Sequence, residues 1–375
     1  MVTRTDRLRA CAHLTRWLGP WTQGSAVPRG VDRHELDVPI HQQRDRSFRA
    51  WLYRPRGKVV GSYLLAPGLH YAGPADPRLD RFCSILAAAG IAVLAPFLPD
   101  YTKLVIERDA LADMERCLDL MLDLDVVPAG TRPGVFSISF GSILALKLAA
   151  SPRREAIGGL MLFGGYADFS ATIRFCLSGE LDDGSTIRRD PLNQPVVFMN
   201  LLETMPGAPE SPEERRVLRR EWHRFARETW GRDEMKVEDR HHRVARRLAD
   251  EMPESLRELY LLGCGVREGG RELCHRAMAT PTERQLFCDP RDALRELRTP
   301  LRIVHGVEDD VIPYTQAHKF ASHLPTYVDH KVYLTGLYGH TSTSGAGKVR
   351  DLGRELSAMG RIVYDMVQMA SQPRA

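Results

Sequence analysis

The segment GVFSISFGS (residues 134–142) joins an apolar strand pattern to an Ala- and Leu-rich helix pattern. A serine on such a strand-to-helix turn is a typical nucleophile when small residues lie two positions before and two positions after it, because larger side chains would clash with the adjoining strand and helix. Around Ser139 these positions are Ser137 and Gly141. Ser139 is therefore a candidate nucleophile, and the alternative is that it is only a small residue in a tight turn.

Ser137 departs from the usual pattern, because glycine is the common residue at that position of the motif. Serine is still small, so the departure is mild. Ser137 itself is disfavoured as the nucleophile, since its own flanking positions are Val135 and Ser139.

A carboxylate candidate follows the nucleophile, in the chain order Ser, Asp, His that this arrangement uses. The segment HGVEDDVIP (305–313) ends a predicted buried strand and contains H-G-x-x-D, with Asp309 as the acid. Active sites of open α/β sheets lie at the carboxyl ends of the strands. Asp310 is an alternative acid, and either aspartate could instead cap a helix near Pro313.

A histidine candidate comes last. VYLTGLYGHTSTSG (332–345) is a predicted strand that runs into a Gly-rich loop containing His340. One predicted helix and one predicted strand separate His340 from Asp309, so both loops are expected at the same edge of a sheet.

The elements around these residues alternate between buried strands and helices. Strands are predicted at 34–40, 47–55, 59–68, 91–99, 134–139, 157–166, 300–306 and 330–336, and helices at 76–90, 108–124, 140–151, 314–324 and 355–370. The first two strands read as an antiparallel pair. The alternation after them predicts a mostly parallel sheet with helices on both faces.

The pattern changes between about residue 170 and residue 295, where the chain is charged, helical in period and poor in strands. We interpret this stretch as an insertion between two strands, hence a lid or cap. Within it, NQPVVFMNLLETM (193–205) is an amphipathic candidate that serves either as the core of the lid or as the wall of an acyl pocket.

With these three residues in this order, the chain resembles the α/β-hydrolase superfamily over about residues 45–170 and 295–370, and GGYADF (164–169) is similar to uncharacterised bacterial members. The resemblance implies a mostly parallel eight-stranded sheet with helices on both faces and a helical lid insertion. The expected division is an N-terminal extension (1–45), a first core part (46–169), the lid (170–295) and a second core part (296–375).

The resemblance also implies roles for individual residues. Ser139 would be the nucleophile, His340 the general base, and Asp309 the carboxylate that orients His340. An oxyanion hole needs two backbone N–H groups. Phe140 and Leu69 are the implied donors, although Pro67-Gly68 stands where many relatives have His-Gly.

Two residues beside Leu69 could line the same site. His70 and Tyr71 follow it directly in APGLHYAGPADP (66–77). The alternative for His70 is a residue on an exposed surface loop.

Composition limits the other classes of function. Across 375 residues the formal net charge is only +4, which does not indicate nucleic-acid binding. The seven cysteines are scattered without a CxxC pair, which favours a reducing compartment over a disulfide framework. The N-terminal segment is a poor signal peptide and no apolar run is long enough to span a membrane, so we expect a cytoplasmic protein.

No metal or cofactor site is expected. Asp239, Arg240, His241 and His242 are close in sequence, but adjacent histidines do not point the same way on a helix, and we expect an exposed helical face there.

The favoured function is a serine hydrolase that acts on a small-molecule ester, thioester or amide through an acyl-enzyme. An acyltransferase on the same triad, and a non-catalytic scaffold that binds a ligand or partner, are the alternatives. The sequence leaves the acyl group, the leaving group and the oligomeric state open.

Overall fold

The computed structural model describes residues 2–19, 22, 25–40, 43–237, 240–336 and 352–374 of the chain. Among these residues, eight strands form one sheet in the order β1-β2-β4-β3-β6-β7-β8-β9. The strands are β1 (Val31–Ile40), β2 (Gln43–Pro55), β3 (Gly61–Ala66), β4 (Ile91–Pro96), β6 (Gly134–Ile138), β7 (Gly159–Phe163), β8 (Leu301–Gly306) and β9 (His330–Thr335). The described part of the chain also contains a short pair of strands, β5 (Thr131–Arg132) and β10 (Gln372–Pro373).

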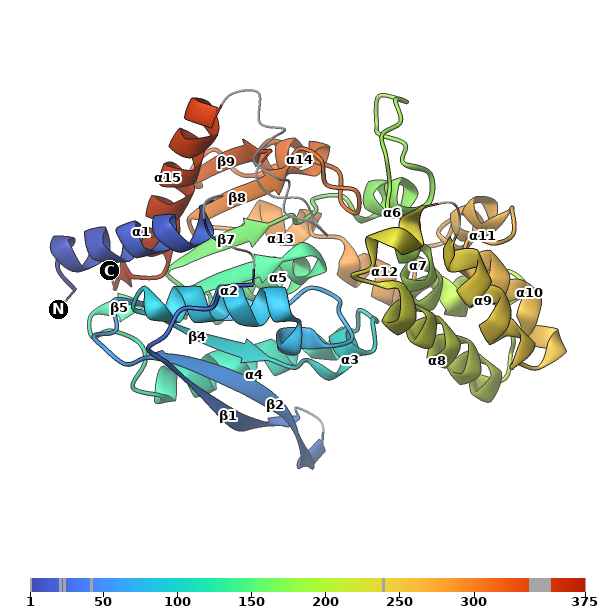
Figure 1. Ribbon diagram of the computed structural model, residues 1–375, viewed down its shortest axis with the longest axis horizontal. Coiled ribbons are helices and arrows are strands. Elements are labelled where there is room, and N and C mark those ends of the chain that lie inside the picture. Colours follow the sequence, from blue (N-terminus) through green and yellow to red (C-terminus); the bar gives the residue numbers. More distant parts are fainter. Residues whose placement is uncertain are drawn as a thin grey trace.

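The large sheet is mostly parallel, as predicted. The strands from β4 to β9 in the sheet order run parallel to their neighbours, whereas β2 is antiparallel to both β1 and β4. The predicted antiparallel pair near the N-terminus is therefore confirmed as the edge of this sheet. The parallel strands direct their carboxyl ends toward a group of helices on one side of the molecule (Figure 1).

Helices cover both faces of the sheet, which explains why its inner strands read as continuous apolar runs. Every residue of β3, β4 and β8 is buried. Alternate residues of β3 join different hydrophobic clusters: Leu64 and Ala66 lie in one, and Tyr63 and Leu65 in the other. This alternation is the period of two expected of a strand that is covered on both faces.

Each face has its own set of helices. The first cluster is completed by α4 (Asp109–Asp123), α5 (Ser142–Ala150) and α14 (Thr315–His323). The second is completed by α1 (Arg4–Leu18), α2 (Pro77–Ala88) and α15 (Leu352–Met369). The predicted start of α2 is confirmed, because the Asp76 side chain accepts a hydrogen bond from the Arg78 backbone N–H and Pro77 follows it.

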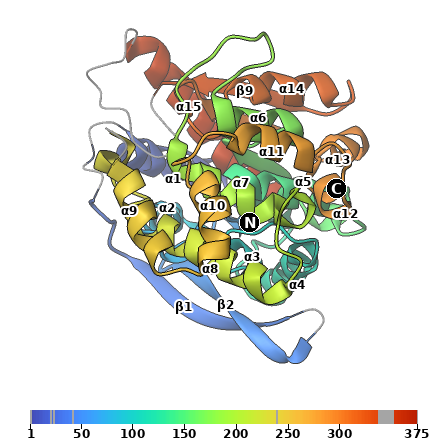
Figure 2. The same ribbon diagram turned by 90° about the vertical axis from the view of Figure 1, so that its right-hand side faces the viewer.

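Helices also fill the chain between β7 and β8, and we call residues 169–296 the helical insertion. Its helices are α6 (Phe169–Ser178), α7 (Gln194–Leu201), α8 (Pro212–Thr229), α9 (Arg240–Asp250), α10 (Glu254–Gly263), α11 (Gly270–Ala277), α12 (Glu283–Cys288) and α13 (Arg291–Glu296). Figure 2 looks onto this group, with α8, α9 and α10 in front of the sheet. Its core includes the fully buried side chains of Phe198, Trp222, Phe225 and Tyr260.

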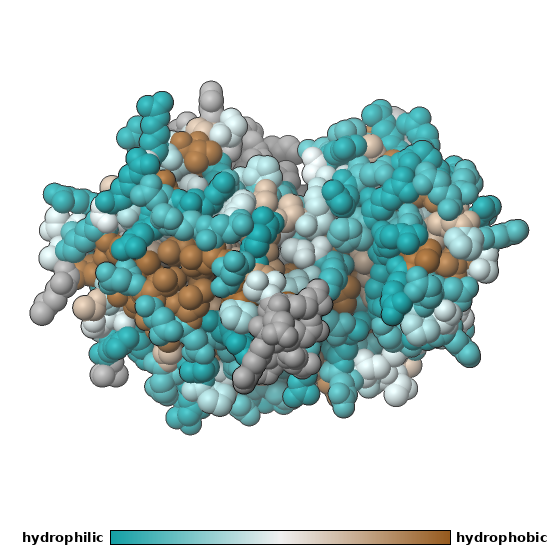
Figure 3. Space-filling model, turned by 90° about the horizontal axis from the view of Figure 1, so that it is seen from below, coloured by the Kyte–Doolittle hydropathy of each residue, from teal (hydrophilic) through white to brown (hydrophobic). Residues whose placement is uncertain are grey.

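The surface of the insertion is mostly hydrophilic on the face seen in Figure 3, whereas hydrophobic residues gather on the half that carries the sheet. This agrees with the charged helices of the insertion, where Arg224 of α8 pairs with Glu251 beyond α9. Such exposed pairs contribute little stability individually. Buried apolar residues therefore hold the insertion together.

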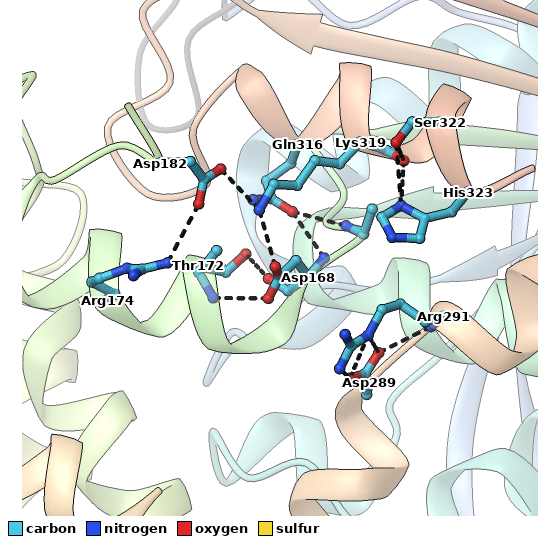
Figure 4. Close-up of polar contacts among 12 residues, drawn as sticks. Asp168, Thr172, Arg174, Asp182, Asp289, Arg291, Gln316, Lys319, Ser322 and His323 are labelled. Atoms are coloured by element: carbon cyan, nitrogen blue, oxygen red, sulfur yellow. Dashed lines mark hydrogen bonds and ion pairs between the residues drawn. The ribbon is translucent and has the colours of Figure 1, made fainter. Parts of the chain in front are cut away.

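A polar network fastens the beginning of the insertion to the core (Figure 4). The Lys319 ammonium of α14 lies 2.9 Å from an Asp168 carboxylate oxygen and 2.8 Å from one of Asp182. The Gln316 side-chain oxygen accepts hydrogen bonds from the backbone N–H groups of Ala167 and Asp168. The entry to α6 is thus anchored to α14 by both charge and hydrogen bonds.

Two properties concern the whole described chain. The seven cysteines are free thiols, and six of them are buried. Within the described residues, no helix combines the length and the hydrophobicity needed to cross a membrane.

Candidate active site

Ser139 lies on a sharp turn between β6 and α5. Its φ angle is +53°, a left-handed conformation that residues with a side chain adopt rarely and at a cost of about 1–3 kcal/mol. A short 3₁₀ turn (Ser139–Gly141) connects it directly to α5. The strain is tolerated because the buried strand before the turn and the buried helix after it fix both ends.

The neighbours of Ser139 are small because the turn packs against backbone. A Cβ on Gly141 would lie 2.5 Å from the Pro67 carbonyl oxygen and closer still to that of Ala66, so no side chain fits there. Ser137 is fully buried, and its hydroxyl has no hydrogen-bond partner among the described residues. A serine therefore fits at the position where glycine is usual.

The backbone beside Ser139 is held in place from two sides. Tyr101, fully buried, donates a hydrogen bond from its hydroxyl to the Phe140 carbonyl oxygen at 3.2 Å. Gly68 lies so near that a Cβ on it would sit 3.3 Å from the Ser139 Cβ. The two segments that carry the predicted oxyanion donors, Leu69 and Phe140, therefore meet at Ser139.

His70 lines the same cavity and is largely buried, with 20% of its side chain exposed. Its Nδ1 accepts a hydrogen bond from the Ala72 backbone N–H, and its Nε2 lies 3.4 Å from an Asp76 carboxylate oxygen. Burial lowers the pKa of His70, which Asp76 opposes only in part. Because Nδ1 accepts the bond from Ala72, the proton of the neutral imidazole is placed on Nε2, on the side of Asp76.

Tyr71 lies against His70, with their ring centroids 4.5 Å apart. Trp230, at the end of α8, approaches both rings, at 5.7 Å from His70 and 6.3 Å from Tyr71. Among the described residues, His70 and Trp230 are on the cavity wall and Tyr71 is not. These aromatic contacts join the loop after β3 to the insertion.

Asp309 follows β8 and is buried, with 3% of the residue exposed. One carboxylate oxygen accepts hydrogen bonds from the backbone N–H groups of Val311 and Ile312, both at 2.9 Å. The other lies 3.5 Å from His305 Nε2, which is itself 2.8 Å from the Ile312 carbonyl oxygen. The loop thus fixes the carboxylate in a single orientation.

Asp310 has a different set of partners. Its carboxylate lies 3.2 Å from the Lys236 ammonium of the insertion, which also lies 2.7 Å from Asp190. Burial favours a lower pKa for Lys236, but the two carboxylates outweigh burial and raise it. Asp310 therefore helps to connect the core to the insertion.

His340 lies outside the described residues. The strand before it, β9, pairs in parallel with β8, and Thr335 at its end is level with Gly306. Glu355 of α15 accepts hydrogen bonds from the Thr335 hydroxyl and the Gly336 N–H. Since β6 and β8 are separated by β7 alone, the ends of these two strands lie roughly 10 Å apart.

A cavity of about 250 Å³ lies between the carboxyl edge of the sheet and the helical insertion. Ser139, Phe140, Leu69 and His70 line its sheet side. The insertion contributes α6, α7 and the segment that follows α8. The predicted nucleophile and both predicted oxyanion donors thus line one cavity.

Solved structures share the fold of this chain. An acylaminoacyl peptidase in complex with Z-Gly-Gly-Phe-chloromethyl ketone matches with a TM-score of 0.51 at 10% identity, covering 92% of this chain and 43% of that chain. The chain has the α/β-hydrolase fold. It spans less than half the length of the first structures it matches.

Two further matches have lower TM-scores. An esterase from Pyrococcus furiosus has a TM-score of 0.48 at 10% identity, covering 89% of this chain and 91% of that chain. Est1E from Butyrivibrio proteoclasticus has a TM-score of 0.45 at 14% identity, covering 89% and 98%. No protein-family model and no curated protein matches the sequence.

The cavity wall contains residues that the sequence analysis did not single out. Asp190, Lys236, Trp230 and Asn200 all line the cavity from the insertion. Lys236 had one weak signal, as the single lysine in an Arg-rich stretch. Asn200 lies in the segment 193–205, for which a pocket wall was one of two alternatives. Asp190 and Trp230 carried no signal, since packing of the insertion brings each of them to the site.

One expectation about the insertion is wrong. His241 was expected on an exposed helical face, but it is 2% exposed and packs edge-on against Phe225. Its Nδ1 lies 3.0 Å from the Met235 carbonyl oxygen, so the ring serves a structural hydrogen bond. Among the described residues, no three His, Cys, Asp or Glu side chains come together as a metal site would require.

Proposed function

We propose that this protein is a serine hydrolase that cleaves a small-molecule carboxylic ester, or a thioester or amide, through an acyl-enzyme. The observation that carries the proposal is the conformation of Ser139. A strained, positive-φ serine at the carboxyl edge of the sheet, facing a cavity, is what an α/β-hydrolase nucleophile requires. Strain of this kind is costly, and its retention is characteristic of functional sites.

The other triad members are assigned from chain order and position. Asp309 is the proposed acid, because its carboxylate is fixed at the end of β8, whereas Asp310 pairs with Lys236. His340 is the proposed base, and the roughly 10 Å between the ends of β6 and β8 leaves space for an imidazole between Ser139 and Asp309.

The proposed reaction has two steps. The Ser139 oxygen attacks the substrate carbonyl carbon and passes its proton to His340, while the N–H groups of Leu69 and Phe140 stabilise the negative oxygen. The bond to the leaving alcohol breaks, and the alcohol takes the proton from His340. Water then repeats the sequence: it gives a proton to His340, the acid departs, and Ser139 regains its proton.

Cys176 also lines the cavity but is a poor rival nucleophile. Burial raises the pKa of its thiol to about 12, and the thiol donates a hydrogen bond to the Val311 carbonyl oxygen. A thiol rather than a thiolate is weakly nucleophilic. The chemistry is therefore assigned to Ser139.

Labelling with a fluorophosphonate probe tests the nucleophile. Wild-type protein should be labelled, Ser139→Ala should not, and Ser137→Ala should be labelled as the wild type is. Ser137 is the matched control because it lies two residues before Ser139, on β6, and its fully buried hydroxyl has no hydrogen-bond partner among the described residues. A folded wild type that is not labelled would overturn the proposal and favour a non-catalytic scaffold.

Paired aspartate variants test the acid. With p-nitrophenyl acetate, Asp309→Asn should lower kcat by about 10³–10⁴-fold, because asparagine holds the histidine in the wrong tautomer. Asp310→Asn should keep most of kcat while losing stability, since it weakens the pair with Lys236. Loss of kcat only in Asp310→Asn would exchange the two roles.

A further inference from the structure

The cavity has an enclosed half and an open half. The enclosed half, which we call the inner chamber, is formed by buried apolar side chains of the core and of α6 and α7. These are Ile106, Phe169, Ile173, Val196, Val197 and Val311. On α7, Val196 and Val197 lie on the same helical face as Asn193 and Asn200, which also line the cavity.

Two polar side chains of the inner chamber are bonded to the protein itself, and Lys236 and Asp190, which also line the cavity, pair with each other at 2.7 Å. The Asn200 side chain accepts a hydrogen bond from the Ile106 N–H and donates to the carbonyl oxygens of Leu104 and Val196. The Cys176 thiol donates to Val311. A ligand beside Ile106, Ile173, Val196 and Val197 therefore meets an apolar surface, where a polar group would lose its bonds to water.

The open half has the opposite character. It is bordered by His70, Asp76 and Arg78 from the core and by Gly231 and Asp233 from the insertion. The Arg78 side chain is 56% exposed, and Gly231 and Asp233 are exposed. Water reaches this half, and charged groups lie around it.

The order of the two chemical steps decides which part of a substrate belongs in which half. The leaving group must depart first, and water must then take its place beside the acyl-enzyme. Both movements need an open path. The acyl group stays bound to Ser139 until the last step, so it can occupy an enclosed space throughout.

We propose that the inner chamber binds the acyl group of the substrate and selects unbranched or aromatic apolar acyl groups, while the open half takes the leaving group. This inference rests on the proposed function, since it assumes an acyl-enzyme at Ser139. It excludes charged and amino-acyl groups from the chamber, because burying an unpaired charge there is strongly unfavourable. The face of α7 that carries Val196 sets the limit of acyl length.

The experiment compares p-nitrophenyl esters from acetate to decanoate, read as kcat/KM against chain length. Val196→Phe should shift the optimum to shorter chains and lower the ratio of kcat/KM for long over short esters about tenfold, because one methylene in an apolar pocket already changes rates by that much. Val196→Ala should shift the optimum to longer chains. Opposite shifts at one position do not arise from a general loss of folding.

Val217 provides the matched control. It is a partly buried valine on α8 that packs against the same hydrophobic cluster, and among the described residues it is not on the cavity wall. Val217→Phe and Val217→Ala should leave the chain-length optimum where the wild type has it. A second series, acetate esters of alcohols of rising length, should show the same preference order in both Val196 variants as in the wild type.

The outcomes separate the two proposals. If wild-type Ser139 is not labelled by fluorophosphonate and no ester is cleaved, the proposed function fails. If labelling and cleavage occur but the Val196 variants leave the acyl optimum unchanged, or shift the alcohol series instead, the acyl assignment is overturned and the serine hydrolase stands. Preference for an amino-acyl or dicarboxylic ester over apolar esters would also overturn it.

Discussion

The sheet edge and the helical insertion each supply one wall of the cavity, but close-packed backbone supports the first wall and side chains on helices form the second. Behind the sheet wall, Gly141 lies against the carbonyl groups of Ala66 and Pro67, and Asp309 is held by two backbone N–H groups. On the insertion wall, valines of α7 form the surface, and the Asn200 and Lys236 side chains connect it to the core.

This difference separates two functions of the site. A wall made of close-packed backbone admits no added atom, so it can hold reacting groups within the narrow tolerances that catalysis needs. A wall made of side chains on a helix can change its shape by single substitutions. We therefore expect the sheet wall to govern whether the reaction occurs and the insertion wall to govern which acyl group is accepted.

The largest expected effect is on the sheet wall. Gly141→Ala places a methyl group against the carbonyl oxygens of Ala66, the last residue of the central strand β3, and of Pro67, which follows it, so neither can easily withdraw. We expect a loss of about 4 kcal/mol in the free energy of unfolding and no fluorophosphonate labelling of any folded fraction. Urea unfolding followed by circular dichroism measures the first and gel fluorescence the second.

Gly360→Ala is the control for this substitution. Gly360 is an exposed residue of α15. A Cβ added to it would have no described neighbouring atom within 4 Å. Alanine should stabilise the helix there by about 0.5–1 kcal/mol. A Gly141→Ala protein with nearly wild-type stability would show that the two walls do not differ in tolerance.

A smaller effect is expected where the insertion joins the core. Lys236→Met leaves the buried carboxylate of Asp190 and the partly buried carboxylate of Asp310 without the ammonium between them. Removing one member of a buried ion pair typically costs about 3 kcal/mol, and we expect that loss in urea unfolding at pH 7.

Lys103→Met is the matched change at the surface. Its side chain is 69% exposed and pairs with Asp100 at 3.3 Å, so the expected loss is below about 1 kcal/mol. Equal losses in both variants would indicate that the Lys236 cluster does not stabilise the insertion on the core.

The sheet wall could be predicted from the sequence because its constraints are local. Ser139 needs small neighbours within two positions, and Asp309 lies directly after an apolar strand, so short patterns indicate both. The alternation of buried strands and helices likewise predicted the sheet, since each strand carries its own apolar run. His340 was predicted in the same way, from its place directly after an apolar strand, and it stays a prediction.

The insertion wall could not be predicted in the same way, because its contacts join distant parts of the chain. Lys236 and Asp310 are 74 residues apart, and Asn200 bonds to Ile106 across 94. The sequence indicated a helical stretch between about residues 170 and 295 and two alternatives for 193–205, but helical periodicity does not say what a helix face packs against. His241 was misplaced for that reason.

The smallest expected effect is a pH dependence where the two walls meet at His70. Burial lowers the pKa of His70 below its ordinary value near 6.5, so the folded state resists a proton that the unfolded state accepts. Acidification from pH 8 toward pH 5 should therefore destabilise the wild type through this residue. His70→Gln takes up no proton, so the stability difference between wild type and variant should shrink as the pH falls.

Urea unfolding of wild type, His70→Gln and His34→Gln at several pH values measures this difference. His34 is exposed on β1, and its replacement should leave the pH dependence as in the wild type. A difference that widens toward acid for His70→Gln would mean that the folded state holds a cationic His70 paired with Asp76. Protonation of His70 would then strengthen the contact between the loop after β3 and Asp76 at the start of α2. The hydrogen bond from the Ala72 N–H to Nδ1 would have to break.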